Sequence, residues 1–297
     1  MRLLFAIAHH FDPEPAPDGK SRAGKHGSLR RDPGPRLAAL TACIASLHQH
    51  FGARQCVLDI ATRTALPASQ DLAAEVDVLV CTTRGRHLLD RLRLPKNLWQ
   101  HHATDAEPLL LGFECQAALA ERLGIYDWYC YLEDDLILHD PLFFAKLAWF
   151  AAYAGDEALL QPNRFERAPA GHFHKAYVDG DLAERVTAPF QDLHDRPELT
   201  GLFLDRKVLF RRARNPHSGC YFLNARQMER FARHPAFLRR DDTRFVGPLE
   251  SAATLGVMQA FRVYKPAPAC AGFLEVEHHG TSFLGLVGSV VALPPQG

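Results

Sequence analysis

Three consecutive carboxylates, Glu133-Asp134-Asp135, are the residues whose type and spacing point most directly to chemistry. They follow an aromatic and apolar run at residues 128–132, which is typical of a strand buried on both faces of a parallel sheet. Buried charges need a partner or a cation, so we expect the acids at the carboxyl end of that strand, where open α/β sheets bind ligands. A hard divalent ion would relieve their mutual repulsion. An acidic turn or a helix N-terminus explains the same residues without a metal.

The first half of the chain alternates between strand-like and helix-like patterns. Strands are predicted at residues 3–8, 56–60, 76–81 and 128–132, and helices at residues 37–47 and 113–123. This order predicts an α/β fold with a doubly wound, mostly parallel sheet. His9 emerges at the end of the first strand, Arg36 stands at the start of the first helix, and Arg84 follows the strand at 76–81. Residues 86–108 are irregular in pattern.

The second half has less regular patterning. Strands are predicted at residues 159–163, 219–224 and 260–266, with a helix at 251–259. Polar residues 163–200 have little periodicity, which suggests an excursion that covers a site. The apolar tail at residues 282–293 predicts a packed final element, with peripheral membrane contact as the alternative. The basic residues of the loop at 11–35 can meet a polyanionic ligand or remain solvated.

Composition places the chain among globular proteins and excludes several classes. With 297 residues, 47% hydrophobic and 23% charged, it can bury a sizeable core, and we expect one domain at 1–297 with halves at 1–140 and 141–297. Zero formal net charge argues against nucleic-acid binding. Seven cysteines without a CxxC pair are typical of buried reduced thiols in a cytosolic protein. We therefore expect a cytoplasmic location, at most at the inner face of the membrane.

The layout resembles the GT-A-type nucleotide-sugar-dependent glycosyltransferases, which have a Rossmann-like sheet and a smaller acceptor-side β region. Four segments in the family's order carry the resemblance, and they are Glu133-Asp134-Asp135, residues 218–223, residues 247–251 and Glu277-His278-His279-Gly280. The first resembles the family's DxD motif in an EDD form. The third resembles the turn that carries the general base of inverting members, and the fourth resembles the terminal metal-binding histidine segment.

The resemblance implies a role for each candidate residue. Asp135 would bind Mn²⁺ or Mg²⁺ together with His278 or His279. Asp134 would lie near the nucleotide ribose, and the nucleotide site would also include Glu133, Arg84, Arg36 and His9. Glu250 would be the general base. Many inverting members have Glu-Asp at this turn, whereas Ser251 follows Glu250 here.

The chemistry of sugar transfer agrees with these residue types. A sugar nucleotide departs as a diphosphate, and a divalent ion held by a carboxylate neutralises the charge that grows on it. The expected function is metal-dependent transfer from a nucleotide sugar, a UDP-sugar first, to a glycan or glycolipid acceptor in polysaccharide biosynthesis, with inversion. A metal-dependent phosphoesterase and a sugar nucleotidyltransferase are the alternatives. A nucleotidyltransferase usually has a Gly-rich loop after its first strand, and the residues following Ala8 offer none.

Overall fold

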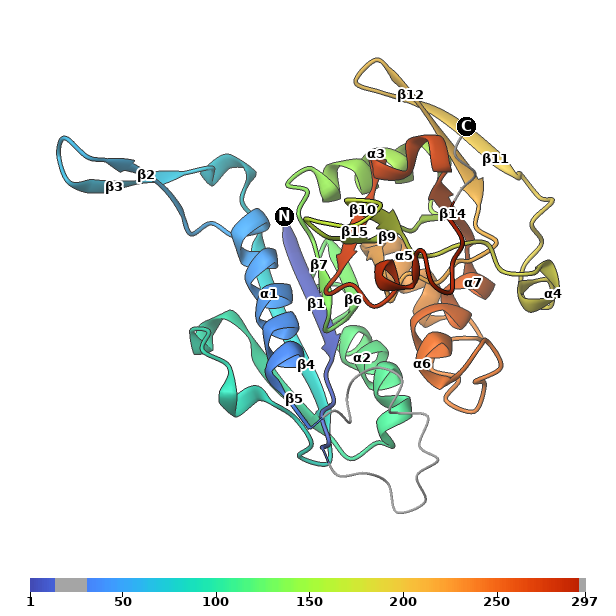
Figure 1. Cartoon of the computed structure of the whole chain (residues 1–297), viewed down its shortest axis with the longest axis horizontal. Helices are drawn as coiled ribbons and strands as arrows, with labels where there is room; N and C mark the ends of the chain where they lie inside the picture. Colours follow the sequence, from blue (N-terminus) through green and yellow to red (C-terminus); the bar gives the residue numbers. More distant parts are fainter. Residues whose placement is uncertain (14–30, 294–297) are drawn as a thin grey trace.

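A five-stranded sheet forms the centre of the computed structural model, which describes residues 1–13 and 31–293 (Figure 1). The spatial order of its strands is β13-β6-β1-β4-β5, and β13 alone runs antiparallel to its neighbour. The strands are β1 (Arg2–Ala8), β4 (Glu75–Thr83), β5 (Gln100–Thr104), β6 (Trp128–Glu133) and β13 (Cys220–Asn224). The predicted α/β class with a mostly parallel sheet is confirmed.

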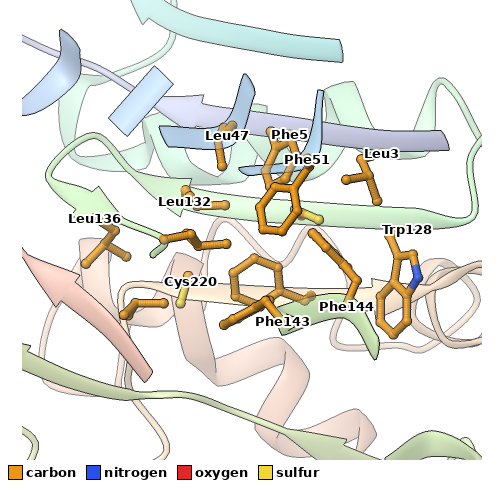
Figure 2. Packing of buried hydrophobic residues seen from close by; sticks show 14 of the residues in the cluster. Leu3, Phe5, Leu47, Phe51, Trp128, Leu132, Leu136, Phe143, Phe144 and Cys220 are labelled. Carbon is orange, nitrogen blue, oxygen red and sulfur yellow. The ribbon is translucent and has the colours of Figure 1, made fainter. Parts of the chain in front are cut away.

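Helices cover both faces of this sheet because successive strand residues point to opposite sides and are apolar on both. On one face, Leu3 and Phe5 pack against α1 and α3 (Figure 2). The ring of Phe144 in α3 lies 5.0 Å from Phe51 of α1 and 6.1 Å from Phe5. The opposite face packs against α2, α5 and α7. The helices are α1 (Gly34–Phe51), α2 (Leu111–Ala120), α3 (Phe143–Ala154), α4 (Glu184–Thr187), α5 (Ala225–Ala232), α6 (Pro248–Glu250) and α7 (Gly256–Ala260).

Two smaller four-stranded sheets come from the chain after β6. One has the order β10-β9-β15-β7, with β7 (Leu136–Ile137), β9 (Asn163–Arg167), β10 (Lys175–Tyr177) and β15 (Glu275–His278). The other has the order β11-β12-β14-β8, with β8 (Ala158–Leu160), β11 (Glu198–Phe203), β12 (Arg206–Arg212) and β14 (Arg262–Pro266). Because β7 follows the acidic run directly, its pairing with β15 brings the end of the chain to those acids.

Two predictions about the first half need correction. The strand predicted at residues 56–60 is present as β2 (Gln55–Asp59), but it pairs only with β3 (Thr64–Ala68), in a hairpin that projects from the body and does not join the central sheet (Figure 1). The residues of β2 have strand propensity, but no other element of the described chain packs over them, and Leu58 is 67% exposed. The region predicted to be irregular at 86–108 contains the edge strand β5, whose residues are mostly polar and none of which is fully buried.

Two predictions about the second half and one about the cysteines also need correction. The excursion at 163–200 contains β9, β10 and α4 and begins β11, so it is less irregular than its polarity suggested. The tail is not a packed element, because Val290 is 78% exposed and no large side chain of the described tail is buried. Cys56, on the projecting hairpin, is exposed, unlike most of the other free thiols. Within the described residues, no helix is long and apolar enough to cross a bilayer.

The difference in burial between the central sheet and the projecting hairpin predicts which leucine side chains stabilise the fold. We expect Leu3→Ala, which removes a fully buried side chain of β1, to lower the free energy of unfolding by about 2–5 kcal/mol. Leu58→Ala in the exposed hairpin is the matched control and should change it by less than about 0.5 kcal/mol. Denaturant titration measures both. Equal losses in the two variants would show that the hairpin is covered in solution.

Candidate active site at the carboxyl edge of the central sheet

The three acids lie at the carboxyl end of β6, as the sequence predicted. β6 runs between β1 and β13, so its end meets the ends of both neighbours. Gly219, just before β13, lies directly against the Glu133 carboxylate, and a Cβ there would overlap it. The φ of Gly219 is +62°, a left-handed value that also favours glycine. The first residue of the strand predicted at 219–224 is therefore a point where the backbone approaches the acids closely.

Asp134 is fully buried and is held from two sides. His9 Nδ1 lies 2.5 Å from Asp134 Oδ2, and Arg36 Nη2 lies 2.5 Å from Asp134 Oδ1. The backbone N–H of Leu88 donates to His9 Nε2 at 3.1 Å, so the imidazole proton is on Nδ1 and is donated to Asp134. A neutral His9 thus orients the Asp134 carboxylate, which in turn fixes Arg36.

Arg36 supplies positive charge between the acids. Its Nη1 lies 3.1 Å from Asp135 Oδ2 while Nη2 contacts Asp134. Burial disfavours the charged guanidinium, but Asp134 and Asp135 together raise the pKa of Arg36. The sequence analysis assigned the relief of repulsion to a divalent ion. The structure adds a second source of positive charge, because Arg36 pairs with both Asp134 and Asp135.

His278 reaches the same edge from β15. Its Nδ1 lies 2.9 Å from Glu166 Oε1, and its Nε2 lies 3.8 Å from Asp135 Oδ2. Burial alone would lower the pKa of His278, but the hydrogen bond to Glu166 and the charge of Asp135 raise it. His279 instead donates its backbone N–H to the carbonyl of Asp135 at 2.8 Å. Of the two candidate histidines, His278 is therefore the one whose ring nitrogen approaches the acid.

Glu133 is in a different electrostatic environment from the other two acids. Burial, partly offset by Arg164 and reinforced by the charge of Asp135, raises the pKa of Glu133 to about 7. Its nearest cation is Arg164, whose Nη1 lies 3.8 Å from Oε2. Arg164 is itself committed to Asp179, with Nε 2.9 Å and Nη2 2.7 Å from Oδ1. Glu133 can therefore hold or release a proton near neutral pH, whereas Asp134 is tied to Arg36.

A small pocket opens beside these groups. Its volume is about 70 Å³, and the polar side chains that line it include Glu133, Asp135, Arg36 and His10. Ligand pockets usually have roughly 300–1,000 Å³, so this space fits a small group such as one phosphoryl group and not a whole nucleotide. Asp134 does not line the pocket, and its part is to hold Arg36 in place.

Two predicted site residues lie apart from this cluster. Arg84, at the end of β4, is half exposed and pairs with Glu107 at 2.5 Å, and it does not line the pocket. Glu250 ends α6 next to Leu249, which lines the pocket. Its carboxylate lies beside Gly247 and forms no hydrogen bond or ion pair with other described residues. The basic loop residues between 14 and 30 lie outside the described part of the chain.

Sequence reasoning missed two residues of this site, Arg164 and Glu166. Both are on β9, which pairs parallel with β15 and so places Glu166 beside His278. Arg164 and Glu166 are two positions apart, with Phe165 between them, which is the spacing of side chains on one face of a strand. The sequence analysis instead interpreted residues 163–200 as a polar excursion with little periodicity, so this short alternation was not recognised as a strand.

The fit of a divalent ion can be tested on these side chains. No group of three or more His, Cys, Asp or Glu residues in the described chain has the arrangement of a metal centre. His278 Nε2 and Asp135 Oδ2 are too far apart for a hydrogen bond at 3.8 Å, yet two coordination bonds of about 2.1 Å each can span that gap. Glu166 orients the imidazole as the outer carboxylate of a metal-bound histidine does. The residues fit an ion that completes its coordination with substrate phosphate and water.

Comparisons with known proteins identify no relative. No protein-family model matches the chain, and no curated protein is similar to it in sequence. The inference of function therefore depends on the residues and their geometry.

The Glu166–His278 contact predicts a measurable titration. A raised folded pKa means that His278 stabilises the fold below its unfolded pKa, and this contribution is lost as pH rises through the folded value. Glu166→Gln removes the carboxylate, so we expect the pKa of His278 to fall. NMR titration of the labelled imidazole measures it. Glu275→Gln, on the same strand as His278, is the control and should leave the titration unchanged. An unshifted His278 in Glu166→Gln would contradict the assignment.

Proposed function

We propose that this protein is a metal-dependent glycosyltransferase with a GT-A-like arrangement. It transfers a sugar from a nucleotide-sugar donor to a hydroxyl of a glycan or glycolipid, and a UDP-sugar is our first candidate for the donor. The observation that carries the proposal is the convergence of Asp135, His278 and Arg36 at the carboxyl edge of a parallel sheet. These side chains come from segments about a hundred residues or more apart. Ligands of open α/β sheets bind at this edge.

The donor diphosphate is the ligand that this edge suits best. Asp135 and His278 would hold Mn²⁺ or Mg²⁺, which when bound stabilises the charge of the departing diphosphate. Arg36, held by buried Asp134, presents its guanidinium in the small pocket, where it can donate to phosphate oxygens. Since Asp134 and His9 fix this guanidinium, the site needs little reorganisation as charge develops.

The acceptor hydroxyl needs a base, and two carboxylates are available near the pocket. Glu250 follows the pocket residue Leu249 and has no partner among the described residues, so it remains our candidate. Glu133 lines the pocket directly, but its contact with Arg164 and its proximity to Asp135 suit it to the phosphate side. With Glu250 as base, transfer proceeds by direct displacement and inverts the anomeric centre.

A donor screen tests the function as a whole. UDP-, GDP-, CMP- and dTDP-sugars are compared by thermal shift with and without Mn²⁺. We expect one nucleotide class to raise the unfolding temperature, and only with the ion present. Stabilisation by phosphate monoesters but by no sugar nucleotide would favour a phosphoesterase instead. No stabilisation by any sugar nucleotide would contradict the proposal.

Asp135→Ala tests the metal site directly. Removing the carboxylate leaves His278 as the single proposed protein ligand, so Mn²⁺-dependent nucleotide binding should be lost while the fold is retained. Calorimetric titration of UDP with Mn²⁺ measures this. Asp71 is an exposed acid outside the candidate site, so Asp71→Ala is the control and should bind UDP and Mn²⁺ as the wild type does. Wild-type affinity in Asp135→Ala would remove Asp135 from the metal site.

Glu250→Gln separates donor binding from transfer. The substitution keeps the size of the side chain but removes the base, so we expect unchanged nucleotide affinity and a loss of turnover of about 100-fold or more. Release of UDP from the donor identified in the screen, with acceptor present, measures turnover. Glu229→Gln on the exposed face of α5 serves as the control. Near-normal turnover in Glu250→Gln would exclude it as the base.

A further inference from the structure

A second and much larger pocket lies in the second half of the chain. Its volume is about 880 Å³, and its walls come from residues between 163 and 271. This volume is at the upper end of the range of roughly 300–1,000 Å³ that is usual for ligand sites. None of the candidate active-site residues Arg36, Glu133 or Asp135 lines it. The pocket is therefore a distinct feature that the proposed donor site does not account for.

Charged groups of both signs line this pocket, and several neutralise each other. Arg211 pairs with Glu198 at 3.0 Å, and Lys265 pairs with Asp179 at 3.1 Å. The walls also have the ring of Tyr177 and several prolines, which offer apolar surfaces between the polar groups. Such a mixture suits a polyhydroxylated ligand, since hydroxyls both donate to carboxylates and accept from cations, and sugar C–H faces pack on apolar side chains.

Arg212 is a buried wall residue that no carboxylate of the described residues neutralises through an ion pair. Only 8% of the residue is exposed, and it forms no ion pair with the described residues. Nη1 donates to the carbonyl of Asp195 at 2.8 Å, Nη2 reaches Gln191 Oε1 at 3.5 Å, and Nε has no partner in the described chain. Burial lowers the pKa of Arg212, which reflects this incomplete neutralisation. A buried guanidinium beside a large pocket is suited to a carboxylate or phosphate of a ligand.

Arg214 adds a second cation to the same wall. It is exposed, lines the pocket two positions after Arg212, and forms no ion pair within the described residues. Two guanidiniums without carboxylate partners therefore face the pocket. Of the lining acids outside the two ion pairs above, Glu184 lies 3.8 Å from His194 and Asp181 forms no ion pair with the described residues. Arg212 and Arg214, two positions apart, can hold one acidic group of a ligand, and the lining acids can accept hydrogen bonds from its hydroxyls.

Buried ion pairs connect the lining residues Lys265 and Asp179 to the candidate active site. Lys265 and Asp179 line the pocket, and Asp179 accepts two hydrogen bonds from the guanidinium of Arg164. Arg164 Nη1 lies 3.8 Å from Glu133 Oε2. The guanidinium of Arg164 therefore lies between the large pocket and the carboxyl edge of the central sheet. An extended ligand in the pocket can span this separation.

We infer that the large pocket binds the acceptor as an acidic glycan, an oligosaccharide whose carboxylate or phosphate group is held by Arg212 and Arg214. The acceptor role rests on the proposed glycosyl transfer, whereas glycan binding in the pocket does not. Lys265 and Asp179 line the pocket on the side of Arg164, so the end of the glycan at these two residues lies nearest to Glu133.

An oligosaccharide array tests the inference without requiring the natural acceptor. The array contains tri- to hexasaccharides with uronic acid, sialic acid or phosphate groups, each beside its uncharged counterpart, and is probed with the labelled full-length protein. We expect retention of acidic members over their neutral counterparts. Preference among the acidic members distinguishes carboxylate from phosphate. Retention of neutral members alone, or of none, would overturn the inference.

Three variants locate the binding. Arg212→Gln and Arg214→Gln should each weaken binding of the retained glycan by about tenfold or more, because a hydrogen bond between charged groups is lost. Arg214 is exposed, so its variant should keep the wild-type unfolding temperature even if the buried Arg212→Gln does not. Arg206→Gln, an exposed arginine of β12 outside the pocket, is the matched control and should bind normally. Wild-type binding by both pocket variants would contradict the assignment.

Nucleotide titration separates this inference from the proposed function. Arg212→Gln and Arg214→Gln should bind UDP and Mn²⁺ as wild type does. If they lose nucleotide binding and the array shows no glycan, the pocket is a nucleotide site and the inference fails. Acidic glycan binding in a protein that binds no sugar nucleotide would keep the pocket as a glycan site and contradict the transferase proposal.

Discussion

The buried contact between Arg36 and Asp134 is the interaction on which the candidate site depends. Asp134 is fully enclosed at the end of β6, and a lone carboxylate there would be costly, of the order of 3–5 kcal/mol when a buried pair is broken. His9 donates to the same carboxylate from the end of β1. Because both partners come from the start of the chain, the contact joins β1, α1 and β6 at one edge of the sheet.

That contact also changes how the acidic run is interpreted. Three adjacent acids suggested a metal as the positive group between them, and the structure provides Arg36 for that purpose. The metal proposal now depends on Asp135 and His278, where Glu166 orients the imidazole and leaves Nε2 toward the acid. Such an incomplete pair of ligands agrees with an ion that arrives with a diphosphate and not with a resident structural ion.

The two pockets lie largely in different halves of the chain. The small pocket is lined by residues of the first half and by Leu249, and its size fits a phosphoryl group. The large one is built from the second half, where peripheral sheets and loops surround charged side chains. Arg164 links them, since it contacts Glu133 on one side and Asp179 on the other. The proposed donor and acceptor sites are lined by different side chains, so mutations can test the two sites separately.

By itself, the sequence determined the central parallel sheet and the edge at which the acids lie. The continuous apolar runs before His9 and Glu133 required burial on both faces, and charged residues directly after them could only be at the strand ends. Both conclusions follow from the local pattern of apolar and charged residues along the chain. This pattern also placed Arg36 at the start of a helix, which is α1 in the structure.

Only the tertiary structure decided which residues meet there. Because β15 pairs with β7 and β9, the ring of His278 and not that of His279 lies near the acids, and Glu166 lies beside His278. These positions depend on strand registers, which no local sequence pattern specifies. Arg84 ends a strand of the same sheet as the acids, yet it pairs with Glu107 instead of joining them. Contacts between residues far apart in sequence are set by how sheets pack and pair, so residue type and spacing alone could not reveal them.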